Sequence, residues 1–284
     1  MVDVHVRPIV TIAKKEFLDN IRNRWIILLT VLLFLLVIVF SYLAGGQSGG
    51  DSALGDMQST VFGLLSISTI LIPLIAILLG FSTISGEAES GALHVVLTCP
   101  VTRFEVLLGK LLGLGSVIVA AVLIGFGLGG ILITATVGSE SWLSYLAFIG
   151  LTILLGVTVL SLSICISAYC KRRITSIGGG LVILFWGMII GTVFFAVVLG
   201  TGYTLDDLMT GNIPDWFWIE PLFSVPDLTQ MTVMKAFGMN DISMMGFSVN
   251  LPDYMSTPLL LFAHLLWLFI PILLAYLLFK RRDI

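Results

Sequence analysis

The chain has 284 residues, of which 58% are hydrophobic and only 11% charged, and its mean hydropathy is +1.10. Because soluble domains carry about 25% charged residues, this composition excludes a water-soluble globule. The sequence contains no basic patch with interleaved aromatic residues, so it gives no support to nucleic-acid binding.

Six long apolar runs recur along the chain, at residues 25–44, 61–84, 106–136, 142–169, 174–200 and 257–279. A helix rises ~1.5 Å per residue, so each run is long enough to cross about 30 Å of hydrocarbon. The sequence therefore predicts an all-α, polytopic membrane protein with six transmembrane helices.

The charged residues are distributed unevenly between the loops. Thirteen of the 14 basic residues lie before span 1, between spans 2 and 3, after span 4 or after span 6, and Lys235 is the exception. The opposite loops hold ten acidic residues. Basic loops stay in the cytoplasm, so we expect both termini to be cytoplasmic, which agrees with an even number of spans.

Residues 1–24 precede the first span and read as an amphipathic interfacial helix. Apolar side chains recur there at steps of three and four, and basic or acidic residues fill the other face. The apolar positions are Val6, Ile9, Val10, Ala13, Phe17 and Ile21. The pattern fits a lipid anchor and fits equally an elbow helix that also touches a cytoplasmic partner.

The loop at residues 85–105 combines charged and apolar residues, which a merely solvated loop would not need. Gly91 interrupts it, Pro100 ends a short helix, and Thr102 with Glu105 forms a capping box that starts the next helix. A short amphipathic helix in a cytoplasmic loop is suited to docking in a groove of another protein. The candidate contact residues are Glu87, Glu89, Leu93, Val96, Pro100 and Arg103.

The same segment carries a family resemblance. The runs Gly86-Glu87, Ser90 to Leu93, Leu97 to Arg103 and Leu107 to Lys110 resemble the signature of ABC-2 type permeases. The opening run Lys15-Glu16, Asp19 and Arg22 to Trp25 is similar to the copper-processing permeases of nitrous-oxide reductase maturation. Ala92, His94 and Val225 depart from the commoner family residues.

The resemblance implies a half-transporter with residues 25–284 as the six-span permease domain. Two permease chains, in the simplest case a homodimer, would pair, and each would dock residues 85–105 onto a separate ATP-binding subunit. The sequence has no G-x-x-x-x-G-K-[ST] phosphate loop, so we expect a non-catalytic subunit that binds no cofactor itself, with ATP and Mg²⁺ held by two copies of that partner. The plasma membrane of a prokaryote is the expected location.

Residues 201–256 form one large, acidic exterior loop with two apolar pieces, near 216–222 and 228–237, that we expect to fold back as short re-entrant helices. The loop is rich in methionine, whose thioether is a soft ligand that selects Cu(I). The candidate copper residues are Met231, Met234, Met239, Met244 and Met245. The alternative is that these methionines fill gaps in apolar packing.

His264 is the one titratable side chain expected well inside a span. Such a residue usually faces the bundle interior or a water-filled cavity, which makes it a candidate cargo or gating residue. The alternative is a structural histidine bonded to a neighbouring carbonyl. Gly109/Gly113, Gly125/Gly129 and Gly187/Gly191 have the spacing of small residues that let helices pack closely.

Three classes of function compete. The resemblance favours the membrane subunit of an ABC exporter that moves cargo, with copper or a sulfur species suggested by the nearest subgroup. A mechanotransmitter would instead use ATP hydrolysis to drive an extracytoplasmic partner bound at residues 201–256, without moving a solute. An intramembrane enzyme has no support, because the spans offer no carboxylate partner for His264, no H-E-x-x-H and no G-x-S-x-G.

Overall fold

The structure is a computed structural model, and it describes residues 5–48, 57–137, 142–204, 206–207, 213–238, 241–244, 247–250, 252 and 254–282. Six helical spans cross the molecule, as the sequence predicts. They are α2 (Arg24–Ser48), α3 (Met57–Gly80), α6 (Arg103–Val122) continuing into α7 (Leu128–Val137), α8 (Trp142–Tyr169), α9 (Arg173–Gly200) and α12 (Thr257–Arg281).

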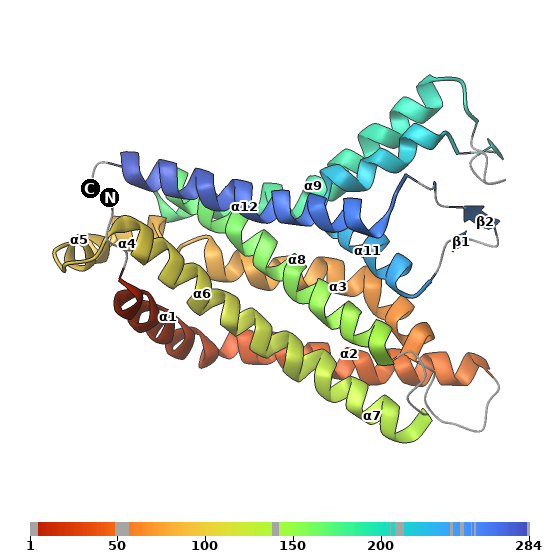
Figure 1. The fold of residues 1–284 in the computed structure, drawn as a ribbon, viewed down its shortest axis with the longest axis horizontal. Coiled ribbons are helices and arrows are strands. Elements are labelled where there is room, and N and C mark those ends of the chain that lie inside the picture. Colours follow the sequence, from red (N-terminus) through yellow and green to blue (C-terminus); the bar gives the residue numbers. More distant parts are fainter. Residues whose placement is uncertain are drawn as a thin grey trace.

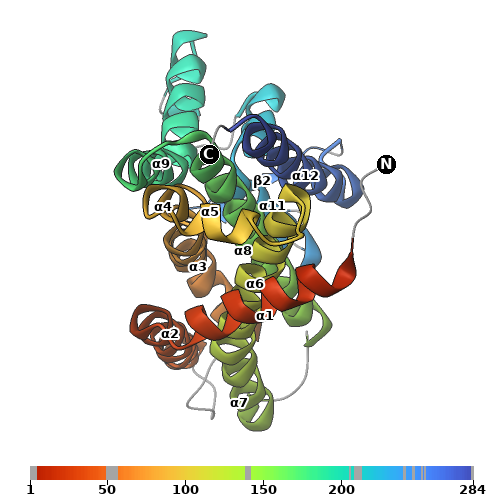
Figure 2. The same ribbon diagram turned by 90° about the vertical axis from the view of Figure 1, so that its left-hand side faces the viewer.

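Helix α8 lies at the centre of the bundle. It packs against α3, α6 and α12, and all four helices contribute to one hydrophobic core (Figures 1 and 2). Helix α9 lies at the edge and is the least buried of the six spans. Its outward face carries large apolar side chains, as expected of a helix that meets lipid or another membrane helix.

A π-helical turn, η1 (Leu123–Gly127), joins α6 to α7 inside the third span, and the sequence analysis did not foresee it. A Cβ atom on Gly125 would lie 2.9 Å from Leu33 Cβ, and one on Gly129 would lie 2.3 Å from Val37 Cγ1. These glycines therefore let α2 approach the third span closely, which confirms the packing role predicted for them.

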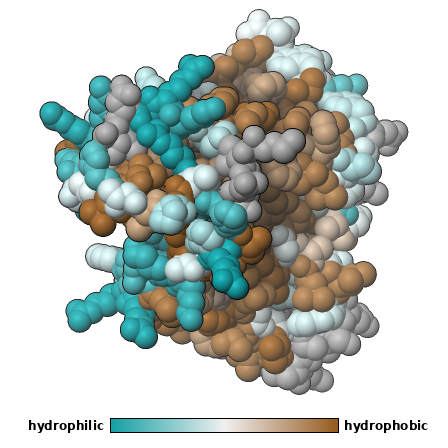
Figure 3. Space-filling model, turned by 60° about the vertical axis from the view of Figure 1, so that its left-hand side comes forward, coloured by the Kyte–Doolittle hydropathy of each residue, from teal (hydrophilic) through white to brown (hydrophobic). Residues whose placement is uncertain are grey.

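One end of the bundle carries α1 (Val6–Ile21), the short helices α4 (Ser85–Glu89) and α5 (Ala92–Leu97), and the last turn of α12 (Figure 1). We call it the basic end, because the loops rich in lysine and arginine meet there. Figure 3 shows hydrophilic side chains gathered on one side of the molecule beside a broad hydrophobic belt. Charged loops next to an apolar belt are the surface expected of a membrane protein.

Helix α1 crosses α6 at the basic end (Figure 2), so a helix is present where the N-terminal amphipathic helix is predicted, and its role as an interfacial elbow stays a prediction. A Cβ on Gly113 would lie 2.6 Å from the carbonyl oxygen of Ala13, and a Cβ on Gly109 would lie 2.8 Å from Ile12 Cβ. The predicted small-residue packing is therefore found here too, although the partner is α1 and not another span.

The opposite end holds the predicted exterior loop. Its two apolar pieces form a 3-10 helix, η2 (Asp215–Phe223), and α11 (Val225–Ala236), and α11 packs against α8, α12, α3 and α9. A two-stranded antiparallel hairpin follows, with β1 (Asp241–Met244) paired to β2 (Phe247–Asn250). This hairpin is a small addition to the all-α fold that the sequence analysis did not predict.

The contact between α1 and α6 can be tested with two glycines of the same helix. Gly113→Ala places a methyl group against α1 backbone, and we expect a loss of about 1–3 kcal/mol of stability from overpacking. Gly115→Ala is the matched control, because its Cβ meets only Val157 Cγ2 at 3.8 Å. Thermal unfolding in detergent and protease cleavage of α1 give the measurement. Equal behaviour of the two variants would contradict the close approach.

Candidate functional site

The segment between α3 and α6 projects at the basic end as two short helices. Gly91, with φ of 77°, separates α4 from α5, and Thr102 and Glu105 form the predicted capping box at the start of α6. Leu93 is fully buried and Val96 is half-buried, so these two hold α5 on the bundle. The outward face of α5 and the turn that follows it present His94, Val95, Cys99 and Pro100, and Val95 is 68% exposed.

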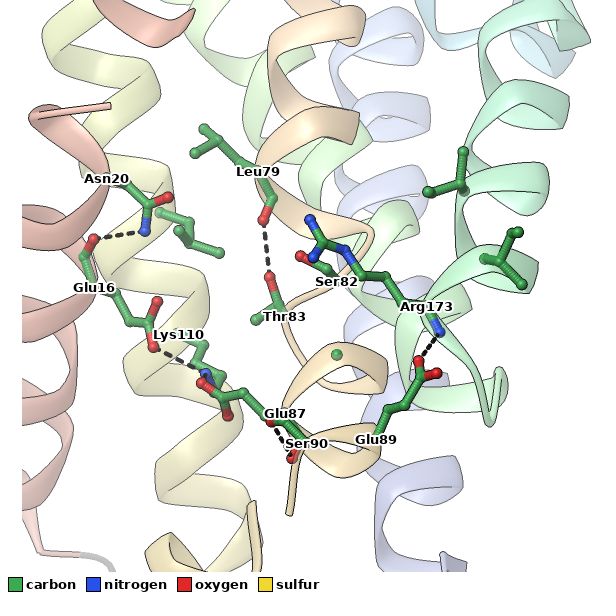
Figure 4. A pocket seen from close by; sticks show the side chains of 14 residues that line it. Glu16, Asn20, Leu79, Ser82, Thr83, Glu87, Glu89, Ser90, Lys110 and Arg173 are labelled. Atoms are coloured by element: carbon green, nitrogen blue, oxygen red, sulfur yellow. Dashed lines mark hydrogen bonds and ion pairs between the residues drawn. The ribbon is translucent and has the colours of Figure 1, made fainter. Parts of the chain in front are cut away.

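Lys110 lies at the centre of a buried ion cluster beneath these short helices. Its Nζ is 2.9 Å from Glu16 Oε1 on α1 and 2.6 Å from Glu87 Oε1 on α4 (Figure 4). The Lys110 side chain is only 3% exposed. An ammonium group removed from water needs such partners, so this cluster holds α1, α4 and α6 together.

Glu89 connects α4 to the start of α9. Its carboxylate accepts a hydrogen bond of 2.8 Å from the backbone N–H of Arg173, the first residue of α9 (Figure 4). The N-cap residue of α9, Arg172, makes no side-chain capping bond. Glu89 therefore supplies from another element the negative charge that a helix N-terminus favours.

Arg103 connects the start of α6 to the end of α12. Its Nη1 donates to the carbonyl oxygens of Phe279, Lys280 and Arg282 at 2.5, 3.0 and 2.9 Å. The guanidinium also lies 5.6 Å from the centre of the Phe279 ring. Because a helix leaves its last carbonyl groups unpaired, Arg103 acts as the C-terminal cap of α12.

Three of the predicted docking residues join helices of this chain to one another. Glu87 joins α4 to Lys110 of α6, which in turn bonds Glu16 of α1. Glu89 joins α4 to α9, and Arg103 joins the start of α6 to α12. Their predicted contact with an ATP-binding subunit stays a prediction. Lys110 was not predicted as a member of the site, although a lysine at the start of an apolar run was the available signal.

A cavity of about 720 Å³ opens beside the ion cluster, between α1, α3, α4, α6 and α9. Figure 4 shows Glu16, Lys110 and Glu87 on one side of this cavity and Arg173 with Glu89 on the other. Glu87 Oε2 is buried there without a hydrogen-bond partner in the described structure. The cavity therefore lies between two groups of charged residues, and α4 contributes a glutamate to each group.

His264 lies on α12 with both ring nitrogens occupied. Its Nδ1 is 3.0 Å from the Leu260 carbonyl oxygen, which can only accept, so Nδ1 carries a proton. Its Nε2 is 3.1 Å from the Thr229 hydroxyl on α11, whose one proton is shared between this nitrogen and the Val225 carbonyl oxygen at 2.8 Å. The side chain is fully buried, so the geometry favours a structural histidine that joins α11 to α12.

The five candidate copper methionines fall into three groups. Met231 and Met234 are buried on α11 within the hydrophobic core, which is where gap-filling side chains lie. Met244 belongs to β1, but its side chain is not among the described ones, and Met239 and Met245 lie outside the described residues. The described residues hold no group of three or more His, Cys, Asp or Glu that could bind a metal.

Glu220 on η2 is a buried carboxylate that the sequence analysis counted only among the exterior acids. It is 8% exposed, and its Oε1 has no hydrogen-bond partner in the described structure. Burial, and then the charge of Asp227, raises the pKa of Glu220 to about 7. Gly187 and Gly191 of α9 lie against this region, because Cβ atoms there would meet Asp227 Oδ2 at 3.1 Å and Glu220 Oε1 at 3.8 Å.

The Lys110→Met variant tests the ion cluster. It removes the buried counter-charge that Glu16 and Glu87 share and leaves only the exposed Lys15, 3.8 Å from Glu16, so we expect a loss of about 3–5 kcal/mol of stability. Adding Glu16→Gln and Glu87→Gln to the same chain should recover part of this loss, because no unpaired charge then remains. Thermal unfolding in detergent measures both effects. A single variant as stable as wild type would rule out a buried, paired lysine.

The pKa of Glu220 predicts a pH dependence. A carboxyl whose pKa is raised from 4.5 to about 7 on folding binds more protons in the folded state, so stability falls as the pH rises from about 4.5 to about 7 and is flat above. Glu220→Gln should remove this component of the slope, while Asp215→Asn, on the same helix, should keep it. Melting temperatures of the wild-type protein and of both variants across this pH range show which substitution removes the slope.

Comparison with known proteins agrees with this arrangement. Residues 10–284 match the family model described as ABC-2 family transporter protein. A probable ABC transporter permease protein NosY of Pseudomonas aeruginosa is 32% identical over 286 residues, which cover 98% of this chain and 100% of that protein. A probable ABC transporter permease protein NosY of Stutzerimonas stutzeri is 30% identical over 275 residues, covering 95% and 97% of the two chains.

The match spans the six helical spans, the ion cluster and the projecting helices α4 and α5. Membership implies an ATP-binding partner subunit, and the comparisons name a permease and no catalytic family. The chain therefore belongs to the ABC-2 transporter family and is a multi-pass membrane permease of an ABC transporter, similar to NosY proteins.

Proposed function

We propose that this permease receives force from an ATP-binding subunit through α5 and passes it to four helices of the bundle. The observation that carries the proposal is the set of links around α4 and the start of α6. Lys110 joins α4 to α1 and α6, Glu89 joins α4 to α9, and Arg103 joins the start of α6 to α12. A displacement of α4 and α5 would therefore strain several spans together.

The outward face of α5 is the proposed contact with the ATP-binding subunit. Val95 is exposed in this chain, and an exposed apolar side chain beside polar ones suits a groove in a partner protein. ATP and Mg²⁺ would be held by that subunit, in two copies. The basic end would then face the cytoplasm of a prokaryotic cell, in agreement with the distribution of basic residues.

A second permease chain completes the proposed transporter. Helix α9 exposes apolar side chains along much of its length, including Phe185, Met188 and Phe195. In a membrane, helices associate through close packing, and α9 carries Gly178 and Gly200, whose Cβ positions meet no atom within 4 Å. We assign α9 as part of the contact with an identical chain.

The cargo proposed from the resemblance is copper or a sulfur species for metalloenzyme maturation. The alternative is a mechanotransmitter that moves an extracytoplasmic partner and no solute. One observation supports the mechanotransmitter: hydrogen bonds join η2 to two of the spans. Trp186 on α9 donates to the Phe223 carbonyl and Trp267 on α12 donates to the Leu222 carbonyl, each at 2.9 Å. Movement of α9 or α12 would therefore carry η2 with it.

The proposed role of α5 predicts different defects for surface and buried residues. Val95→Asp should weaken binding of the ATP-binding subunit roughly ten- to a hundredfold, because it puts a charge in place of about 1.5–3 kcal/mol of apolar burial. Glu87→Gln should leave the subunit bound but lower ATP-driven activity. Thr11→Asp, an exposed position at the same end outside α5, is the control. Co-purification and ATP hydrolysis in reconstituted vesicles measure the two defects.

The same vesicles separate the two functions. Cu(I) uptake or release that follows ATP hydrolysis and is lost in Glu87→Gln would support transport. Hydrolysis without flux of copper or sulfur species, together with an ATP-dependent change in protease cleavage of residues 201–256, would support mechanotransmission. Val95→Asp binding the subunit as well as Thr11→Asp does would refute α5 as the docking element.

A further inference from the structure

A second cavity at the basic end has a different character from the one beside Lys110. Its volume is about 470 Å³, and it lies where α8 and α12 end and α5 begins. The side chains that define its chemistry are His94, Tyr169, Lys171, Leu278, Arg281 and Arg282. Three of these six are lysine or arginine, and none of the described residues that line the cavity is acidic.

In the part of the chain that the structure describes, the cations of this cavity have no carboxylate partner. Among the described residues, no Asp or Glu lies within 4 Å of the charged nitrogens of Lys171, Arg281 or Arg282, whereas Lys110 has two such partners. Arg282 is held in place by the carbonyl oxygens of Ser167, Ala168 and Lys171 at 3.3–3.4 Å. Lys171 and Arg281 are exposed and keep their charge available for an anion.

An apolar stripe leads along α12 to this cavity. Phe269, Leu273, Leu277 and Arg281 follow one another at four-residue steps, so each lies beside the next along the helix surface. The three apolar side chains are 60%, 59% and 43% exposed. The last two turns thus place a lipid-facing surface directly before a cationic side chain.

We propose that this cavity binds the phosphate of an anionic phospholipid, with acyl chains lying along Phe269, Leu273 and Leu277. The level of the cavity in the membrane favours a phospholipid over an acidic protein segment as the ligand. Tyr169 and Arg281 are the last residues of two apolar spans, so the cavity lies at the level where hydrocarbon gives way to headgroups.

The chemistry of the lining fits a phosphate diester. The Arg281 guanidinium can donate two parallel hydrogen bonds to two phosphate oxygens, and Lys171 adds a point charge. Basic pockets between the cytoplasmic ends of membrane helices bind anionic headgroups in this way. Bound lipid would bridge the ends of α8 and α12 next to α5, so it would stabilise the surface on which α5 rests.

The test compares lipids on the full chain in mild detergent by native mass spectrometry. We expect phosphatidylglycerol to be retained over phosphatidylcholine of the same acyl chains, and Lys171→Gln with Arg281→Gln to reduce this preference by about fivefold per cation. The matched control is Arg7→Gln with Lys14→Gln, which removes the same charge from exposed positions of α1 at the same end. This control should keep the preference.

Two further experiments distinguish a phospholipid from the other anions that could fill the cavity. Inorganic phosphate at millimolar concentration should not displace the lipid, since the apolar stripe contributes to binding; complete displacement would reassign the cavity to a free anion. Asp283→Asn should leave the preference unchanged. A preference that exists only in Asp283→Asn would show that the chain's own carboxylate fills the cavity.

Equal loss in the cavity variant and the α1 control would overturn the proposal, because it would reduce the effect to net charge. Retention of phosphatidylglycerol only when the ATP-binding subunit is absent would also overturn it, and would assign the cavity to an acidic segment of that subunit. None of these readouts uses transport or ATP hydrolysis, so the result is independent of the proposed function.

Discussion

The arrangement at the basic end depends on one buried ammonium group. The Lys110 side chain on α6 is only 3% exposed, and its charge is compatible with folding because Glu16 and Glu87 reach it from two other helices. Those carboxylates are 94 and 23 residues away in the chain. The pairing therefore fixes where α1 crosses α6 and where α4 stands, and α5 continues from α4 through a single glycine turn. The neighbouring links of Glu89 and Arg103 extend the same assembly to α9 and α12.

The two ends of the bundle use polar groups in different ways. At the basic end, ion pairs and caps join the short helices to the spans. At the opposite end, neutral hydrogen bonds do so: Trp186, Trp267 and the pair of Thr229 and His264 attach η2 and α11 to α9 and α12. A buried carboxylate, Glu220, lies in that attachment, and one of its oxygens has no hydrogen-bond partner among the described residues. Helices η2 and α11 are thus part of the packed bundle, which is why motion of the spans and motion of η2 are expected to be coupled.

Much of the fold could be predicted, and the reason is that its signals are local. Six apolar runs, the amphipathic period of residues 6–21 and the capping box of Thr102 and Glu105 each depend on residues within a few turns of one another. The hairpin of β1 and β2 and the π-helical turn η1 were not predicted, because neither has a comparable periodic pattern. For the candidate site, the residue types and the segment were predictable, but the direction in which each side chain points was not. Leu93 faces inward while Val95 faces outward on the same short helix.

The sequence by itself determined the class of the molecule, the number of spans, the likeness to ABC-2 permeases and the segment that projects at the basic end. These properties follow from hydropathy and charge summed over short windows, which do not depend on which helix lies beside which. Only the tertiary structure decided the partners of Glu87, Glu89 and Arg103, the enclosure of Lys110 and the convergence of Lys171 with Arg281 around a cavity. The physical reason is that a buried or unpaired charge is defined by its surroundings, and those surroundings come from helices far apart in the chain.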